Sequence, residues 1–137
     1  AAPTVQDLSD TEKVAHWANW QGYLDIDEAT STNPSLVAFG KQTGIDVTYS
    51  EDVNDNNEFY AKYRTQLEQG QPIGYDIVTL TDWMAALWIQ AGYTQKFDKA
   101  LMPNAANLIA GWPSIPIETS ACRGSQASVP LAGTRPS

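Results

Sequence analysis

Strand-like and helix-like segments alternate three times between residues 13 and 90, and this alternation limits the fold more than any other feature of the sequence. The apolar run 13–19, the alternating segment 45–49 and the run 75–80 have the character of strands. A stretch with helical spacing follows each of them. Repeated strand–helix units with right-handed crossovers build a parallel sheet covered by helices on both faces. The sequence therefore predicts an α/β fold with a mostly parallel sheet.

Local start and stop signals set the bounds of the three expected helices. The first helix begins at Pro34 and stops at Gly44, the second is capped by the polar run 52–57 and ends by Gly70, and the third ends by Gly92. Each helix carries an apolar stripe, and we expect the stripe of the second helix to be buried. The stripes are Leu36, Val37 and Phe39, then Phe59, Tyr63 and Leu67, then Met84, Leu87 and Trp88.

The charge balance separates classes of partner. Sixteen Asp and Glu against eight Lys and Arg give a net charge of -8, which repels phosphate backbones and favours cationic partners. We therefore expect no nucleic-acid binding. Solubility alone explains such an excess of acid equally well, so the charge does not decide the function. With 42% hydrophobic residues, the chain is typical of one globular domain.

No pattern in the chain indicates catalysis. His16 lies inside an apolar strand segment without a nucleophile pattern near it, so we expect a core histidine. The segment 52–58 lacks the glycine and glutamate of a calcium loop, which leaves a helix cap as the interpretation. Asp25, Asp27 and Glu28 fit a solvated charge run better than paired acid–base carboxylates. The sequence thus predicts neither a catalytic residue, nor a metal ligand, nor a cofactor.

Two polar and aromatic clusters follow the ends of expected strands. Trp20 and Tyr23 come after the first strand, and Thr81, Asp82 and Trp83 come after the third. Open parallel sheets bind ligands outside the carboxyl ends of their strands, so both clusters are expected at the same edge. The alternative is that the aromatic rings belong to the core or to an interface, and that Asp82 is only a helix cap. Composition alone favours this alternative.

Five short motifs occur in the order found in a known family. They are Asn19-Trp20 with Tyr23, the segment 39–47 from Phe39 to Val47, Asn57-Glu58, the segment 75–78 from Tyr75 to Val78, and Thr81-Asp82-Trp83, with Leu80 where a proline is usual. In this order they resemble the polyamine (spermidine/putrescine) substrate-binding proteins of bacterial ABC transporters. The resemblance spans about residues 13–112. It implies one lobe of a type II periplasmic-binding-protein-like fold, without the second lobe.

The resemblance also implies a ligand and a site. Polyamines join methylene chains to ammonium groups, and a cation over an aromatic face gains about 0.5–2 kcal/mol. Trp20, Tyr23 and Trp83 are then expected to form an aromatic box, with a charge-assisted hydrogen bond from an ammonium to Asp82 and a neutral one at Thr81. The partner would be a membrane permease. The alternatives are another small solute on the same scaffold, or an interaction module whose aromatic rings anchor an interface.

The ends of the chain differ from its middle. We interpret residues 1–12 as a flexible leader, 13–112 as part of the first lobe and 113–137 as an aberrant tail. Shifting the reading frame by one nucleotide over residues 114–127 restores a family-like continuation, which predicts a frameshift. The lone Cys122 is expected to be a bystander. A lobe truncated in this way exposes apolar surface, so we expect self-association.

The expected location follows from the family and from the absence of an apolar run of spanning length. The chain begins as a mature protein would, without a hydrophobic signal sequence. The family resemblance then implies a periplasmic or extracellular protein, with a lipoprotein tether before processing as an alternative.

Overall fold

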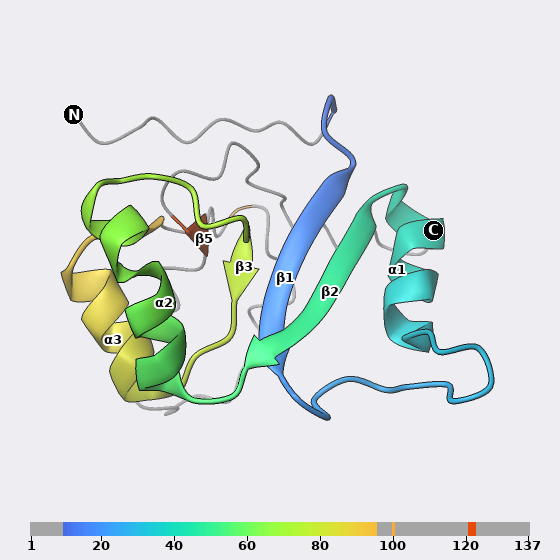
Figure 1. Ribbon diagram of the computed structural model, residues 1–137. Helices are drawn as coiled ribbons and strands as arrows, with labels where there is room; N and C mark the ends of the chain where they lie inside the picture. Colours follow the sequence, from blue (N-terminus) through green and yellow to red (C-terminus); the bar gives the residue numbers. More distant parts are fainter. Residues whose placement is uncertain (1–9, 96–99, 101–120, 123–137) are drawn as a thin grey trace.

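The computed structural model describes residues 10–95, Ala100 and residues 121–122, and these form an α/β arrangement (Figure 1). The elements run in the order β1 (Val14–Trp20), α1 (Pro34–Thr43), β2 (Asp46–Val53), α2 (Asn56–Glu68), β3 (Ile77–Val78), α3 (Asp82–Gln90), β4 (Thr94–Gln95) and β5 (Ala121–Cys122). Three strand–helix repeats therefore occur where the sequence predicts them. Residues 1–9 of the predicted leader, residues 96–99 and 101–112 of the predicted lobe, and most of the tail lie outside the described residues.

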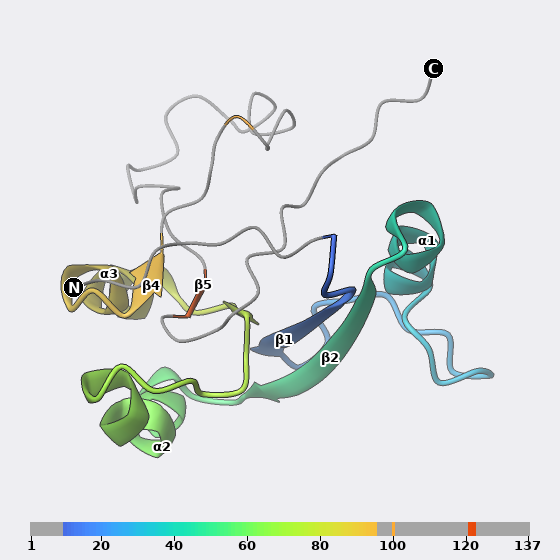
Figure 2. The ribbon, with the colours of Figure 1, turned by 90° about the horizontal axis from the view of Figure 1, so that it is seen from above.

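The main sheet has three parallel strands in the order β2-β1-β3. Trp17 in the central strand pairs with Tyr49 of β2 on one side and with Ile77 of β3 on the other. Figure 2, which looks down on the sheet, shows α1 and α2 on opposite sides of it. The predicted parallel sheet with helices on both faces is thus confirmed, and the second, separate sheet is the antiparallel pair of β4 and β5.

Capping residues define the helix ends. Pro34 occupies the first turn of α1, and Gly44 ends that helix in the left-handed region at φ 73°, donating its N–H to the Gly40 carbonyl at 2.8 Å. Asp55 caps α2, where its Oδ1 accepts the N–H groups of Asn57 at 2.8 Å and Glu58 at 3.0 Å. The expected cap in segment 52–58 is therefore confirmed.

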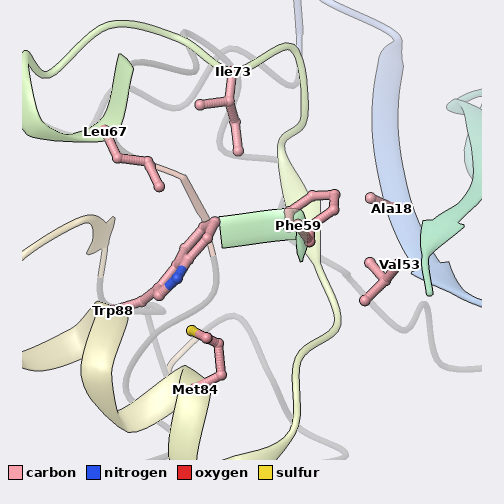
Figure 3. Close-up of a cluster of buried hydrophobic side chains, with 7 residues drawn as sticks. All are labelled: Ala18, Val53, Phe59, Leu67, Ile73, Met84 and Trp88. Carbon is pink, nitrogen blue, oxygen red and sulfur yellow. The ribbon is translucent and has the colours of Figure 1, made fainter. Parts of the chain in front are cut away.

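The core lies between the sheet and the layer formed by α2 and α3 (Figure 3). Phe59 of α2 packs against Trp88 of α3 with ring centroids 6.2 Å apart, and both side chains are buried. The buried cluster consists of Ala18, Val53, Phe59, Leu67, Ile73, Met84 and Trp88. The expected burial of the α2 stripe is confirmed for Phe59 and Leu67, and Met84 and Trp88 of the α3 stripe are buried as well. Leu87 is an exception, since it is 36% exposed.

The first helix is packed less tightly than α2 and α3. Leu36 and Phe39 are only half-buried, and Val37 is exposed, so α1 has no fully buried side chain. The apolar stripe of α1 thus contributes no residue to the buried cluster. Alone in water, a helix of this length is marginal, so α1 depends on its contact with β2.

The third strand is shorter than the expected segment 75–80 because a side chain replaces part of its backbone pairing. The Asp76 carboxylate accepts the His16 N–H at 2.7 Å, while the Asp76 N–H donates to the His16 carbonyl at 2.9 Å. Thr79 continues the contact by donating its N–H to the Ala18 carbonyl at 2.9 Å. The chain therefore stays beside β1 from residue 76 to residue 79, although only Ile77–Val78 form a regular strand.

Two further parts of the structure differ from what the sequence predicts. His16 is exposed, and so is Thr48, its neighbour in β2, so the prediction of a core histidine is wrong. The buried cluster begins only at Ala18, nearer the carboxyl end of β1. In the tail, Ala121 and Cys122 pair with Gln95 and Thr94, whereas the sequence indicates no regular element there. Within the described residues no helix is both long and apolar enough to cross a membrane.

Candidate functional site

The two predicted clusters follow neighbouring strands of the sheet. Ala18 of β1 is level with Val78 of β3, so Trp20, which closes β1, and Leu80, which follows β3, both lie toward the carboxyl edge of the sheet. Both side chains pack against the buried cluster. Parallel neighbours lie about 4.8 Å apart, and Thr81 directly follows Leu80. The sheet therefore brings the turn after Trp20 and the start of α3 to one edge, as the sequence predicts.

Hydrogen bonds from β2 hold the turn after β1. Gly22, at φ 72°, donates its N–H to Glu51 Oε1 at 2.9 Å. Buried Asn19 accepts the Trp20 N–H on its side-chain oxygen at 2.8 Å. Tyr49 donates its hydroxyl to the Trp20 carbonyl at 3.4 Å. Glu51 and Tyr49 thus position the turn that leads to Tyr23, and neither of them was predicted from the sequence as part of the site.

The start of α3 is fastened to the start of α2. Thr81 donates its N–H to Asn56 Oδ1 at 3.2 Å, and Asn56 is 7% exposed. The Thr81 carbonyl accepts the Ala85 N–H at 2.9 Å, which opens α3. The Thr81 hydroxyl does not cap the helix, is shielded from solvent and has no hydrogen-bond partner. Thr81 therefore lies at the edge, but its hydroxyl is shielded from solvent, and its contact with a ligand stays a prediction.

The three aromatic rings of the predicted box differ in exposure. Tyr23 is 70% exposed and Trp83 is 53% exposed, whereas Trp20 is half-buried and packs against the core. In residues 10–95, no ring contact joins any two of these three. Asp82 is exposed in the first turn of α3 and does not cap it through a hydrogen bond. The edge thus carries two open aromatic faces and one free carboxylate, but no closed box.

A second polar cluster lies between β2 and α2 and was not predicted. The Tyr75 hydroxyl donates a hydrogen bond to the Asp52 carboxylate, and the rings of Tyr75 and Tyr63 meet edge to face at 5.9 Å. Burial and the bond to Asp52 raise the pKa of Tyr75 above its ordinary value. Nearby, Lys62 Nζ lies 5.0 Å from the centre of the Tyr63 ring. The rings of Tyr63 and Tyr75 also contact Phe59 of the core, so this cluster stabilises the packing of α2.

A groove of about 570 Å³ lies elsewhere, between α1 and the amino-terminal part of β2. Its walls include Leu36 and Val37 of α1 and Val47 and Tyr49 of β2. None of the five predicted ligand residues lines it. The groove reflects the loose packing of α1 rather than the chemistry of the predicted site. Among the described residues, no three His, Cys, Asp or Glu side chains are arranged to hold a metal ion.

The chain is similar in sequence to two known binding proteins. It is 40% identical over 96 residues to the putrescine-binding periplasmic protein of Pseudomonas aeruginosa. The matched region covers 70% of this chain and 23% of that protein. It is 28% identical over 121 residues to spermidine/putrescine-binding periplasmic protein 1 of Haemophilus influenzae, covering 88% of this chain and 31% of that protein. No family model matches the chain.

A solved structure from the same group of proteins has a similar fold. The structure of a spermidine/putrescine ABC transporter protein from Listeria monocytogenes superposes with a TM-score of 0.55 at 25% identity, covering 72% of this chain and 26% of that one. The chain thus spans about a quarter to a third of the length of these proteins. In sequence and in fold, it is similar to part of the spermidine/putrescine-binding periplasmic proteins of ABC transporters, with the type II periplasmic-binding-protein-like architecture.

Proposed function

We propose that this chain forms part of the solute-binding component of an ABC importer and contributes one side of a polyamine site. In this function the chain binds ligand and catalyses nothing. The whole site would lie between this lobe and a second one, with closure of the two lobes around the ligand. The site residues on this side would be Trp20, Tyr23, Thr81, Asp82 and Trp83.

The proposal is supported by one observation: exposed aromatic rings and an exposed carboxylate follow the carboxyl ends of two neighbouring parallel strands. Trp83 and Tyr23 are exposed, and Asp82 lies between the hydroxyl of Thr81 and the ring of Trp83 in sequence. An ammonium group needs this combination, because aromatic faces attract cations and a carboxylate accepts a charge-assisted hydrogen bond. The relatives named for putrescine and spermidine binding support the same ligand class.

The positive ends of two helices lie at this edge, and acidic residues offset them. The amino ends of α2 and α3 follow β2 and β3 directly and would repel an ammonium group. Asp55 and Glu58 stand in the first turn region of α2, and Asp82 in that of α3. Because Asp55 is engaged as a cap, Asp82 is the carboxylate best suited to meet a cation.

The remaining partners follow from the proposed function. A membrane permease would receive the ligand from the closed protein. The protein would be periplasmic or extracellular, with a lipoprotein tether in organisms that lack a periplasm.

For the 137-residue chain by itself we propose self-association, since Trp83 and Leu87 of α3 and Val37 of α1 leave large apolar side chains exposed. Light scattering that gives a monomeric mass would contradict the self-association.

The test is a titration of the chain with putrescine, followed by backbone and indole signals in two-dimensional NMR. We expect signals of Trp83, Asp82 and Tyr23 to shift, with a weak dissociation constant of about 1 mM, since one open half-site supplies only about 4 kcal/mol. The matched ligand control is 1,4-butanediol, which keeps the methylene chain and lacks the ammonium groups. Equal shifts with both compounds, or none with putrescine, would refute a cation site.

Protein variants separate the polyamine site from the two alternatives. Asp82→Asn should weaken putrescine binding, whereas Glu58→Gln, in the first turn of α2, should leave it unchanged. If a sugar or an amino acid shifts the same signals and putrescine does not, another solute is the ligand. If Trp83→Ala abolishes self-association and leaves putrescine binding intact, the aromatic rings are interface anchors.

A further inference from the structure

We propose that Asn56 is a positioning residue for the site, and that it holds the Thr81–Trp83 turn by accepting the Thr81 N–H. This inference rests on the proposed function and names a residue that the predicted site does not contain. Asn56 is the first residue of α2, and Thr81 directly precedes α3, 25 residues further along the chain.

The need for such a residue follows from where β3 ends. The last backbone bond between this segment and β1 is that of the Thr79 N–H to the Ala18 carbonyl. Beyond it the chain leaves the sheet before α3 begins at Asp82. Trp17 Nε1 donates to Thr79 Oγ1 at 2.9 Å, which fixes Thr79 but not the residues after it. The next fixed point is the bond from the Thr81 N–H to Asn56 Oδ1 at 3.2 Å.

The sequence of α3 cannot supply that bond itself. In a capping box, the side chain at the third helical position accepts the N–H of the cap residue. In α3 the third position is Met84, which is buried in the core and carries no such acceptor. Asn56 therefore performs from α2 what a glutamate or glutamine would perform within α3. Its amide can be held in one orientation because the residue is only 7% exposed.

The position of Asn56 affects the ligand groups directly downstream. Trp83 is two residues beyond Thr81, and its exposed ring has no ring contact that would hold it among the described residues. Its direction is set by the backbone at the start of α3. When the Thr81 N–H loses its acceptor, the first turn of α3 frays, and both Asp82 and Trp83 lose their fixed places. Asn56 thus orients ligand groups without touching the ligand.

The test compares three variants of the chain by amide hydrogen exchange without ligand. Asn56→Leu keeps the volume and removes the acceptor, so exchange of the Thr81 N–H should rise about tenfold. Asn56→Asp keeps an acceptor oxygen and should restore slow exchange. Asn57→Leu makes the same change at the exposed neighbour in α2 and should have no effect. Exchange in β1, at Ala18, should be unchanged in all three variants.

Putrescine titration of the same variants adds the second readout. With Asn56→Leu the dissociation constant followed at Trp83 should rise about three- to tenfold, and Asn56→Asp should bring it back. If Asn56→Leu leaves Thr81 exchange unchanged, or if it raises exchange while affinity stays the same, Asn56 does not position the site. If the unmodified chain fails to bind putrescine, the proposed function fails, and the exchange result still decides whether Asn56 holds the turn.

Discussion

Removing the cap of α2 should destabilise the chain for two reasons: the loss of two hydrogen bonds and the loss of a favourable charge. Asp55 accepts two backbone N–H groups, from Asn57 and Glu58, at 2.8 and 3.0 Å. Loss of such a cap costs about 1 kcal/mol, within about 0.5–2 kcal/mol. The negative charge at the positive end of α2 adds about 0.3–1 kcal/mol at low ionic strength. Asp55→Ala should therefore cost about 1–2 kcal/mol.

Two further variants separate the cap from the charge. Asp55→Asn keeps an acceptor oxygen and removes the charge, so it should cost only about 0.3–1 kcal/mol, and this cost should shrink in 1 M salt, where screening acts within about 3 Å. Asp82→Asn is the matched control in α3, because Asp82 does not cap its helix. It should lose only the smaller, salt-dependent part.

Urea unfolding followed by circular dichroism measures these differences. With a slope of about 2 kcal/mol per molar urea, Asp55→Ala should lower the midpoint by about 0.5–1 M. The reasoning is wrong if Asp55→Ala unfolds within about 0.3 kcal/mol of the unmodified chain. It is also wrong if Asp55→Asn costs as much as Asp55→Ala in high salt, because the two hydrogen bonds would then contribute nothing.

Three other perturbations test the packing, the titration and the backbone of the same structure. Trp88→Ala removes a side chain that is 1% exposed and should cost about 3–5 kcal/mol in urea unfolding, whereas Leu87→Ala next to it should stay within about 0.5 kcal/mol. Burial and the bond to Asp52 raise the pKa of Tyr75, so the unfolded chain ionises first as the pH rises. The contribution of Tyr75 to stability should therefore be complete below pH about 10 and decline at higher pH. Tyr75→Phe should flatten this loss of stability above pH 10. Gly44→Ala places a side chain at φ 73° and should cost about 1–2 kcal/mol, seen as lower helix content in circular dichroism, while no change there would contradict the left-handed cap of α1.

Local signals explain why the helices were predictable from the sequence. Pro34 and Gly44 bound α1, and the polar run that contains Asp55 caps α2, because each of these residues acts within a few positions of itself. The parallel sheet was predictable from the strand–helix alternation, because right-handed crossovers between neighbouring strands allow only a few topologies. The edge that carries Trp20 and Thr81 follows from this topology.

Contacts between distant segments explain what the sequence did not reveal. No periodicity links Asn56 to Thr81, or Glu51 to Gly22, because each bond joins segments more than 20 residues apart. The length of β3 was overestimated because the Asp76 carboxylate takes a backbone role. The predicted aromatic box depends on how side chains are directed after a turn, which strand and helix patterns do not specify. Whether the five predicted residues bind a ligand stays a prediction.

Because β1 lies between β2 and β3, it is synthesised before either of the strands that it pairs with. Trp17 pairs with Ile77, so the sheet cannot close until about 60 further residues have followed β1 from the ribosome. At about 5–20 residues per second, this takes roughly 3–12 s. During that time the apolar segment Val14–Trp20 has at most one of its two neighbours, and for the first part it has neither. The strand on which the sheet is built is therefore open to pairing with other chains for this time.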